Sequence, residues 1–370
     1  MTKKRNGNIE ILRFIFCMLI ILVHFPQEVR YFFGASGYLG VEFFFMISGL
    51  FLGRKLKKDK ELHQKEPISD TLTSSWKYFL SRIKSIYPFY FAAVGFFCIL
   101  NIILKYTKSL NSILYCISDL LFLQIFRFPS ISYTGTVWFL AALFFSLFVL
   151  YPIVRRYYDV YIKYFSLPIV LLNMGYVMRI FHSFEAEPFF DSFLINPGIL
   201  RAIAMLTLGM LVGELSDKLK TLTLSRSGKV ILTTAELISY VFAFAFMIAC
   251  RSDPVKRFDY AAVILIFIGL VITVSEHSYF NGKFDNRFSL FLGKSSMILF
   301  MTHYFWVHNI KELTLRFTGH DDIGNIELLL IGYALSFITG IAVYFVGLAI
   351  RKVFYKIKDM IVLSEKPACS

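Results

Sequence analysis

Cysteine and charged side chains are both scarce in this 370-residue chain. The five cysteines form no Cys-x-x-Cys pair and show no spacing typical of metal ligands, so no metal site is predicted. Charged residues make up only 17% of the chain, which has neither an internal repeat nor a low-complexity tract. No small-residue cleavage site follows the first apolar run, so we expect no cleavable signal peptide.

Apolar side chains dominate instead. Hydrophobic residues account for 57% of the chain and aromatic residues for 18%, and the mean hydropathy is +0.63, well above the values of soluble domains. Because helices are the plausible spanning element for continuous apolar runs, we predict an all-α polytopic membrane protein with a single domain over residues 1–370. Hydropathy predicts a bundle of about ten transmembrane helices, at residues 9–25, 38–53, 85–104, 135–154, 166–181, 198–215, 230–250, 259–275, 288–309 and 327–350.

The distribution of basic residues predicts the topology. With ten spans, 26 of the 39 Lys and Arg residues fall on the side of the two termini, nine on the other side and four within spans. This asymmetry predicts cytoplasmic termini and a short cytoplasmic tail. Much of the net charge of +14 is therefore a topology signal and an attraction to anionic lipid, and no nucleic-acid partner is predicted. A further apolar segment, 113–126, is interpreted as an interfacial or re-entrant helix in the outer connection between the third and fourth spans.

The first predicted span carries ionisable side chains at Glu10, Arg13 and His24. Such groups inside a bilayer usually face the interior of the bundle or a water-filled cavity. Arg13 and His24 are 11 residues apart, which places them about 20° apart around a helix and about 16 Å apart along it. Arg13, a cation near one membrane surface, thus lies on the same helix face as His24, a titratable base inside the span. The alternative is a snorkelling arginine and a histidine that bonds to a carbonyl.

The next two spans add a buried carboxylate and two cations. Glu42 lies inside the second span and needs a partner or water, and Ser48 precedes a glycine suited to close helix packing. Arg82 and Lys84 lie at the cytosolic mouth of the third span, where they either anchor the helix or bind phosphate.

With these features, the sequence resembles those of the acyltransferase-3 family, which consists of bacterial integral-membrane O-acyltransferases. The resemblance rests on five elements in the expected order: the Arg13…His24 pair, the Gly- and Phe-rich run Gly37–Leu50, the Arg82…Tyr87-Pro88 segment, and two later stretches, Thr136–Leu143 with Trp138 and Phe291–His303. Two positions depart from the pattern of many members. Ser85 stands where they have arginine, and Leu143 stands where they have glutamate, a variation that resembles the subgroup acting on capsule or exopolysaccharide units.

The resemblance implies transfer of an acetyl or other acyl group from acetyl-CoA, a co-substrate rather than a bound cofactor, to a hydroxyl of a polysaccharide or its lipid-linked precursor. It implies location in the bacterial cytoplasmic membrane. We expect His24 to be the catalytic base or a nucleophile that becomes acylated, with Arg13, Arg82 and Lys84 holding the phosphates of coenzyme A. The supporting candidates are Glu10, Glu42 and His303, and the residues expected to line the acceptor site or the donor tunnel are Trp138 and Ser48.

Other readings remain compatible with the residues. His303 can be a packing histidine with a backbone partner, and Trp138 an interfacial anchor. Ten spans with buried ions also suit a transporter of polysaccharide or lipid-linked sugar, or a non-catalytic component of an export complex. A homo-oligomer is equally compatible with the sequence.

Overall fold

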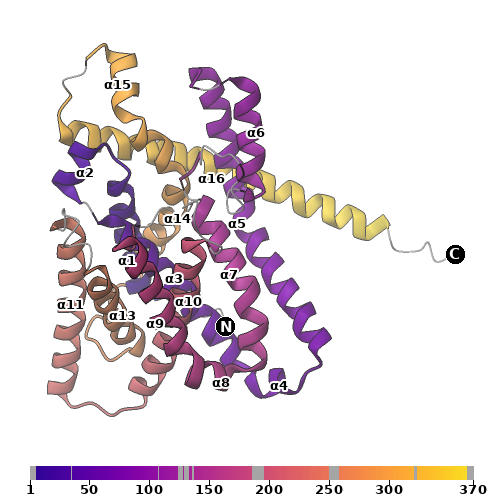
Figure 1. The fold of residues 1–370 in the computed structure, drawn as a ribbon, viewed down its shortest axis with the longest axis vertical. Coiled ribbons are helices and arrows are strands. Elements are labelled where there is room, and N and C mark those ends of the chain that lie inside the picture. The colour runs from indigo at the N-terminus through magenta and orange to yellow at the C-terminus, as the bar shows by residue number, and fades with distance from the viewer. Residues whose placement is uncertain are drawn as a thin grey trace.

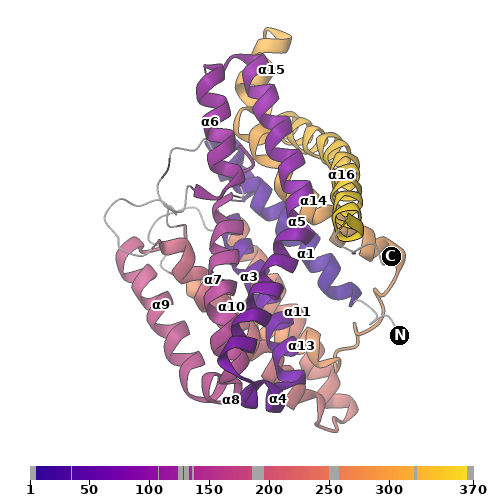
Figure 2. The same ribbon diagram turned by 90° about the vertical axis from the view of Figure 1, so that its right-hand side faces the viewer.

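The regular structure of the chain is helical throughout the described part. The computed structural model describes residues 6–34, 36–106, 108–123, 128, 133–135, 137–185, 196–249, 258–320 and 323–364. Within these residues the helices form one bundle, with several long helices running roughly side by side (Figures 1 and 2). In chain order the helices are α1 Gly7–Val23, α2 Gln27–Phe33, η1 Gly37–Leu39, α3 Gly40–Lys58, α4 Lys60–Lys65, α5 Ile68–Leu104, α6 Ser109–Leu120, α7 Val137–Arg156, α8 Tyr158–Val160, η3 Tyr161–Phe165, α9 Ser166–Phe181, α10 Pro197–Lys220, α11 Arg226–Ala249, α13 Asp259–Ser275, α14 Arg287–His308, α15 Ile310–Thr318 and α16 Asn325–Ser364.

Each predicted span coincides with a helix. Among the described residues, six helical stretches are long and apolar enough to cross a membrane: α5, α7, the continuous stretch Tyr158–Phe181, α10, α11 and the Asn325–Lys356 part of α16. The other four predicted spans correspond to α1, α3, α13 and α14, of which α1 and α13 have 17 residues each. α3 and α14 are long enough, but they carry more polar and charged side chains.

The boundaries differ from the sequence-based ones in several places. The third span was expected to begin at residue 85, but α5 begins at Ile68, and α16 continues past residue 350. The apolar segment 113–126 corresponds to α6, which packs against α5. In this contact Tyr90 Oη of α5 donates to the backbone oxygen of Asp119 in α6 at 2.7 Å. Several parts of these predictions lie outside the described residues. They are residues 124–126 of that segment, residue 136 of the predicted span 135–154, residue 250 of the predicted span 230–250, and the two chain ends with their cations.

The helices differ strongly in how much of their surface is covered. In α10 and α7, 67% and 61% of the apolar window is buried inside the protein, so both helices belong to the interior. The corresponding shares are 28% in α11 and in α16 and 17% in the Tyr158–Phe181 stretch, so these helices present most of their apolar surface outward, as expected against lipid. Figure 1 shows α16 crossing the upper part of the bundle and projecting beyond α5.

Side-chain contacts give the relative directions of the central helices. α1 and α14 run in the same direction, because Cys17 Sγ donates to Ser296 O at 3.2 Å and His24 lies beside His303 further along both helices. α3 and α10 also run in the same direction, since the two helices meet at Glu42–Arg201 near their beginnings and at Lys57–Asp217 near their ends. α14 and α16 run in opposite directions, because Gly332 lies against Val307 whereas Gly340 lies against Ile298.

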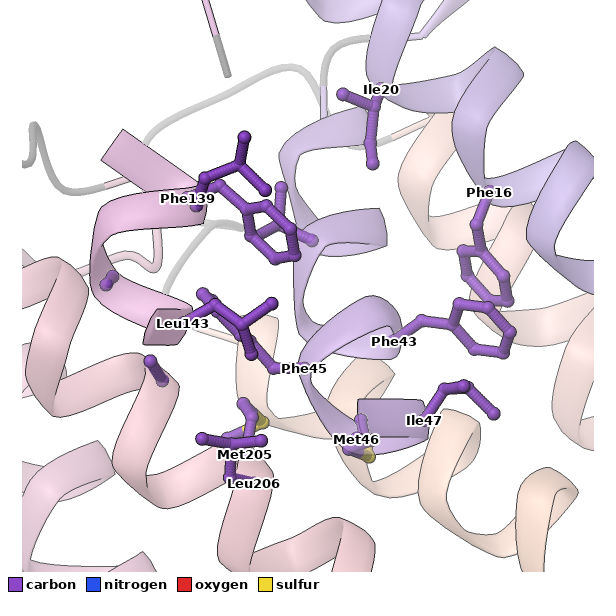
Figure 3. Close-up of a cluster of buried hydrophobic side chains, with 14 of the residues drawn as sticks. Phe16, Ile20, Phe43, Phe45, Met46, Ile47, Phe139, Leu143, Met205 and Leu206 are labelled. Carbon is purple, nitrogen blue, oxygen red and sulfur yellow. The ribbon is translucent and has the colours of Figure 1, made fainter. Parts of the chain in front are cut away.

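Two glycines allow α3 and α10 to pack backbone against backbone. A Cβ atom on Gly49 would lie 1.9 Å from Leu206 O, and one on Gly209 would lie 1.9 Å from Met46 O. The aromatic and aliphatic side chains around this contact form the core shared by α1, α3, α7 and α10 (Figure 3). In that core Phe16 stacks on Phe43 with ring centroids 4.2 Å apart. The close approach of α3 and α10 therefore sets the position of the core aromatics.

We expect Gly209→Ala to destabilise the protein by about 1–3 kcal/mol, because the added methyl group would have to displace the α3 backbone. Thermal unfolding in detergent measures the change. Gly95→Ala is the matched control, since a Cβ on Gly95 of α5 meets nothing within 4 Å. Equal stability of the two variants would show that the α3–α10 contact is not tight.

Candidate active site

His24 lies at the carboxyl end of α1. The helix ends here because Pro26 follows and begins the turn into α2, and the His24 backbone N–H still donates to Ile21 O at 3.1 Å. The half-buried imidazole faces α14, with its ring centroid 5.2 Å from that of His303 and 5.1 Å from that of Tyr304. The end of the first helix thus presents a titratable ring to a second histidine.

His303 is fully buried on α14. Its Nδ1 lies 3.0 Å from Leu299 O, and its Nε2 has no hydrogen-bond partner among the described residues. One turn further on, His308 stacks on Tyr304 with centroids 5.1 Å apart. Gly135, with φ of +62°, lies against the Tyr304 ring, where a Cβ would come within 2.3 Å of it. The histidine cluster is therefore enclosed by α1, α14 and the segment that leads into α7.

Glu42 has the partner that its position required. The Nε and Nη2 atoms of Arg201 both donate to Glu42 Oε1, at 2.7 and 2.5 Å. The ion pair joins α3 to α10, and both side chains are buried. The Trp138 ring covers the Arg201 guanidinium at 5.2 Å, a cation–π contact. Trp138 is thus placed on a buried cation rather than only at the surface of the bundle.

Sequence reasoning missed a second polar centre around Asp259. This fully buried carboxylate at the start of α13 accepts hydrogen bonds from Tyr38 Oη, Ser183 Oγ and the Phe184 N–H, at 2.9, 2.9 and 2.8 Å. It ties η1, the end of α9 and α13 together. The signal in the sequence was a carboxylate at the edge of a predicted span, a position that calls for a partner.

A cavity of about 540 Å³ lies at the opposite end of α1. Basic side chains from α1 and α3 line it, together with the carboxylates of Glu10 and Glu276. The basic lining residues are Arg13, Arg54, Lys55 and Lys58. Arg13 Nη1 donates to Glu10 at 3.1 Å and keeps a quarter of its side chain exposed. The cavity combines a cationic wall with access from outside, which suits a polyanionic ligand.

A second group of cations adjoins the cavity through Lys55. The Lys55 ammonium lies 4.2 Å from the centre of the Tyr78 ring, and Arg82 lies 4.8 Å from the same ring. Tyr78 stacks on Tyr151, next to Arg155. Lys55 lies beyond the predicted span 38–53. Burial lowers the pKa of its ammonium group, and the nearby positive charges of Arg82 and Arg155 lower this pKa further. Such crowding of cations favours an anionic ligand.

Glu66 neutralises one member of this group. Its carboxylate accepts from Arg155 Nε at 2.5 Å and from Arg155 Nη2 at 2.7 Å. These hydrogen bonds lower the pKa of the Glu66 carboxyl. Arg155 is therefore committed to an ion pair, whereas Arg82 packs on Tyr78 and keeps an exposed side chain.

The structure does not bring all candidate residues together. Glu10 is 14 residues from His24 on one helix, about 21 Å along its axis, and belongs to the cavity. Ser48 Oγ donates to Phe44 O at 2.8 Å within its own helix. Lys84 is exposed two positions after Arg82 on the continuous helix α5, so the two side chains leave that helix on different sides.

The residue that departs from the family pattern in α7 has a packing role. Leu143 is 7% exposed and belongs to the apolar core drawn in Figure 3. A carboxylate at this position would need a buried partner. The absence of glutamate at Leu143 is therefore consistent with its surroundings.

The fold and the site define an all-helical membrane protein with a histidine cluster at one end of α1 and a cationic cavity at the other. The model of a family described as an acyltransferase domain, acyltransferase-3, matches residues 6–345. The chain belongs to this family, and the match supports an acyltransferase as the class of enzyme. No curated protein and no solved structure gives a significant match to the chain.

We expect Glu42→Gln and Arg201→Leu each to destabilise the protein by about 3–5 kcal/mol, because each leaves its partner buried without a counter-charge. The double variant should lose less than the sum of the two, because no charge is stranded. Unfolding of the four proteins in detergent measures the coupling. Additive losses would mean that the pair contributes no mutual stabilisation.

Proposed function

We propose that this protein transfers an acetyl group from acetyl-CoA to a hydroxyl of a polysaccharide or of its lipid-linked sugar precursor. The proposal places it in the bacterial cytoplasmic membrane. The observation that supports it best is the arrangement along α1, where Arg13 lines a cationic cavity and His24 faces a histidine cluster about 16 Å further along the helix. Family membership supports the reaction class.

The proposed orientation has ten spans with both termini in the cytoplasm. Parallel packing of α1 with α14 and of α3 with α10 supports the span count, because the first and ninth spans must run in one direction and the second and sixth in the other. The side on which the termini lie rests on the distribution of Lys and Arg residues. In this orientation the cavity opens toward the cytosol, where coenzyme A is made. His24 lies near the outer side, so an acceptor there is reached without moving the donor across the membrane.

The residues suit acyl transfer as follows. The phosphates of coenzyme A bind the cations of the cavity, and the pantetheine arm extends along α1 toward His24. The acceptor oxygen attacks the thioester carbonyl, a C–O bond forms and the C–S bond breaks. The hydroxyl proton passes to His24 and then to the departing thiolate, which leaves as the free thiol. In the second route, a ring nitrogen of His24 attacks the thioester carbonyl, a C–N bond forms, the C–S bond breaks, and the thiolate leaves as the thiol with the ring proton. The acceptor oxygen then attacks the acyl-histidine, a C–O bond forms, the C–N bond breaks, and the hydroxyl proton returns to the ring.

The donor test uses acetyl-CoA labelled in the acetyl group and membranes or nanodiscs that contain the protein and the acceptor polysaccharide. We expect label in the acceptor and stoichiometric release of free thiol. Movement of polysaccharide across the membrane without consumption of the thioester would replace the proposal by transport.

We expect His24→Ala to abolish acyl transfer with little loss of stability, because the half-buried ring contributes little packing. His24→Gln should be equally inactive, since an amide forms hydrogen bonds but does not accept a proton at neutral pH. Both variants should bind coenzyme A as the wild type does, by calorimetry in nanodiscs. Full activity in either variant would remove His24 from the mechanism.

The cations of the cavity, and Arg82 in the adjoining group around Tyr78, should affect donor binding more than turnover. An interaction with phosphate exists in both the ground state and the transition state, so its loss raises KM and spares kcat. Each lost contact should contribute about 1.5–3 kcal/mol, and the partial exposure of these side chains favours the lower end, a roughly 10-fold rise in KM per contact. The variants to measure are Arg54→Gln, Lys55→Gln and Arg82→Gln.

Lys84→Gln is the matched control for these variants. It removes the same charge from α5, two residues from Arg82, but from an exposed side chain for which the structure gives no contact with the cavity or with the Tyr78 ring that joins Arg82 to Lys55. We expect its KM to stay near that of the wild type. A rise in KM for Lys84→Gln alone, without one for Lys55→Gln, would move the phosphate site from the cavity to the exposed side of α5.

A further inference from the structure

We propose that His303 is the positioning residue for His24. In this assignment, which rests on the proposed function, the Nε2 lone pair of His303 accepts a hydrogen bond from an N–H of the His24 ring. The other nitrogen of His24 is thereby left unprotonated and turned toward the acceptor hydroxyl.

The tautomer of His303 follows from its hydrogen bond within α14. Its Nδ1 lies 3.0 Å from Leu299 O, and a carbonyl oxygen only accepts hydrogen bonds, so Nδ1 carries the proton. Neutral imidazole has one donor and one acceptor, so Nε2 is an acceptor. That atom is buried and has no partner among the described residues. An unpaired acceptor in an apolar interior is costly, which makes a donor nearby its natural partner.

The His24 ring supplies that donor. The centroid separation of 5.2 Å between the two imidazoles lets facing ring nitrogens come within hydrogen-bond distance. The ring of Phe300, 6.0 Å from His303, has no donor to offer. Tyr304 meets His24 edge to face on another side and stacks on His308. Of these rings around His303, His24 alone combines a ring N–H with the required proximity.

Pairing of the rings serves the proton transfer. When the acceptor hydroxyl gives its proton to His24, the ring becomes an imidazolium with two N–H donors. One of them donates to His303 Nε2, which remains neutral, and the other later returns its proton to the thiolate of coenzyme A. Because the interior around His303 is apolar, this hydrogen bond to a charged donor is stronger than it would be in water. His303 therefore orients the base and stabilises its charged form without taking the proton.

Two polar substitutions of His303 separate this role from packing. The side-chain oxygen of glutamine reaches the place of Nε2, whereas that of asparagine ends near the place of Nδ1. We expect His303→Asn to lower kcat roughly 10- to 100-fold with unchanged KM for acetyl-CoA, and His303→Gln to stay within about fivefold of the wild type. His277→Asn is the control, because that histidine bonds to Leu219 O at the far end of the bundle. Equal losses in the two His303 variants, or no loss in either, would overturn the assignment.

A second measurement does not depend on acyl transfer. Nitrogen NMR of protein labelled at histidine, with His24 assigned from its loss in His24→Ala, reports the tautomer of that ring. We expect one tautomer in the wild type and in His303→Gln, and a mixture in His303→Asn. The same tautomer population in all three proteins would overturn the pairing. If the wild type transfers no acyl group while the tautomers behave as expected, the proposed function fails and the pairing of the rings holds.

Discussion

The buried ion pair between Glu42 and Arg201 is the interaction on which the centre of the bundle depends. Two opposite charges removed from water are tolerated when they pair with each other, so α3 and α10 must lie side by side in one register. Gly49 and Gly209 permit that register, because each removes a side chain that would collide with the facing backbone. The pair also holds Trp138 of α7 over the guanidinium. Three helices are thus fixed relative to one another by one polar contact inside an apolar core.

The first helix joins two chemically different environments. At its beginning, Glu10 and Arg13 belong to a cavity with cations from α3, and at its end His24 meets the buried His303 of α14. The parallel packing of α1 and α14 keeps these two helices in contact over the intervening length. A single rigid helix therefore determines the distance between the place where a polyanion can bind and the place where a proton can be taken up.

The most polar helices are also the ones that carry the site. α1, α3, α13 and α14 hold His24, Glu42, Asp259 and His303, and none of these four helices is among the six that qualify as spans by length and composition. Arg201, the partner of Glu42, lies on α10, the most deeply covered of those six. The helices that expose most of their apolar surface, α9, α11 and α16, surround this interior. Such a division is expected in a bilayer, because ionisable groups must face protein or water whereas the outer surface must match lipid.

The sequence by itself determined the class of the protein, the position of each main helix and the presence of His24 and Arg13 on one helix. These properties are local: hydropathy over about twenty residues and a repeat of 3.6 residues per turn are read directly from the order of the side chains. The sequence also indicated that Glu42 needs a partner, but it could not identify Arg201, 159 positions away. The cations Arg54, Lys55 and Lys58 looked like a topology signal until the fold placed them around one cavity with Arg13. The contact between His24 and His303, the separation of Lys84 from Arg82 and the centre around Asp259 were decided by the tertiary structure alone, because they depend on which helices pack together, in which direction and with which faces.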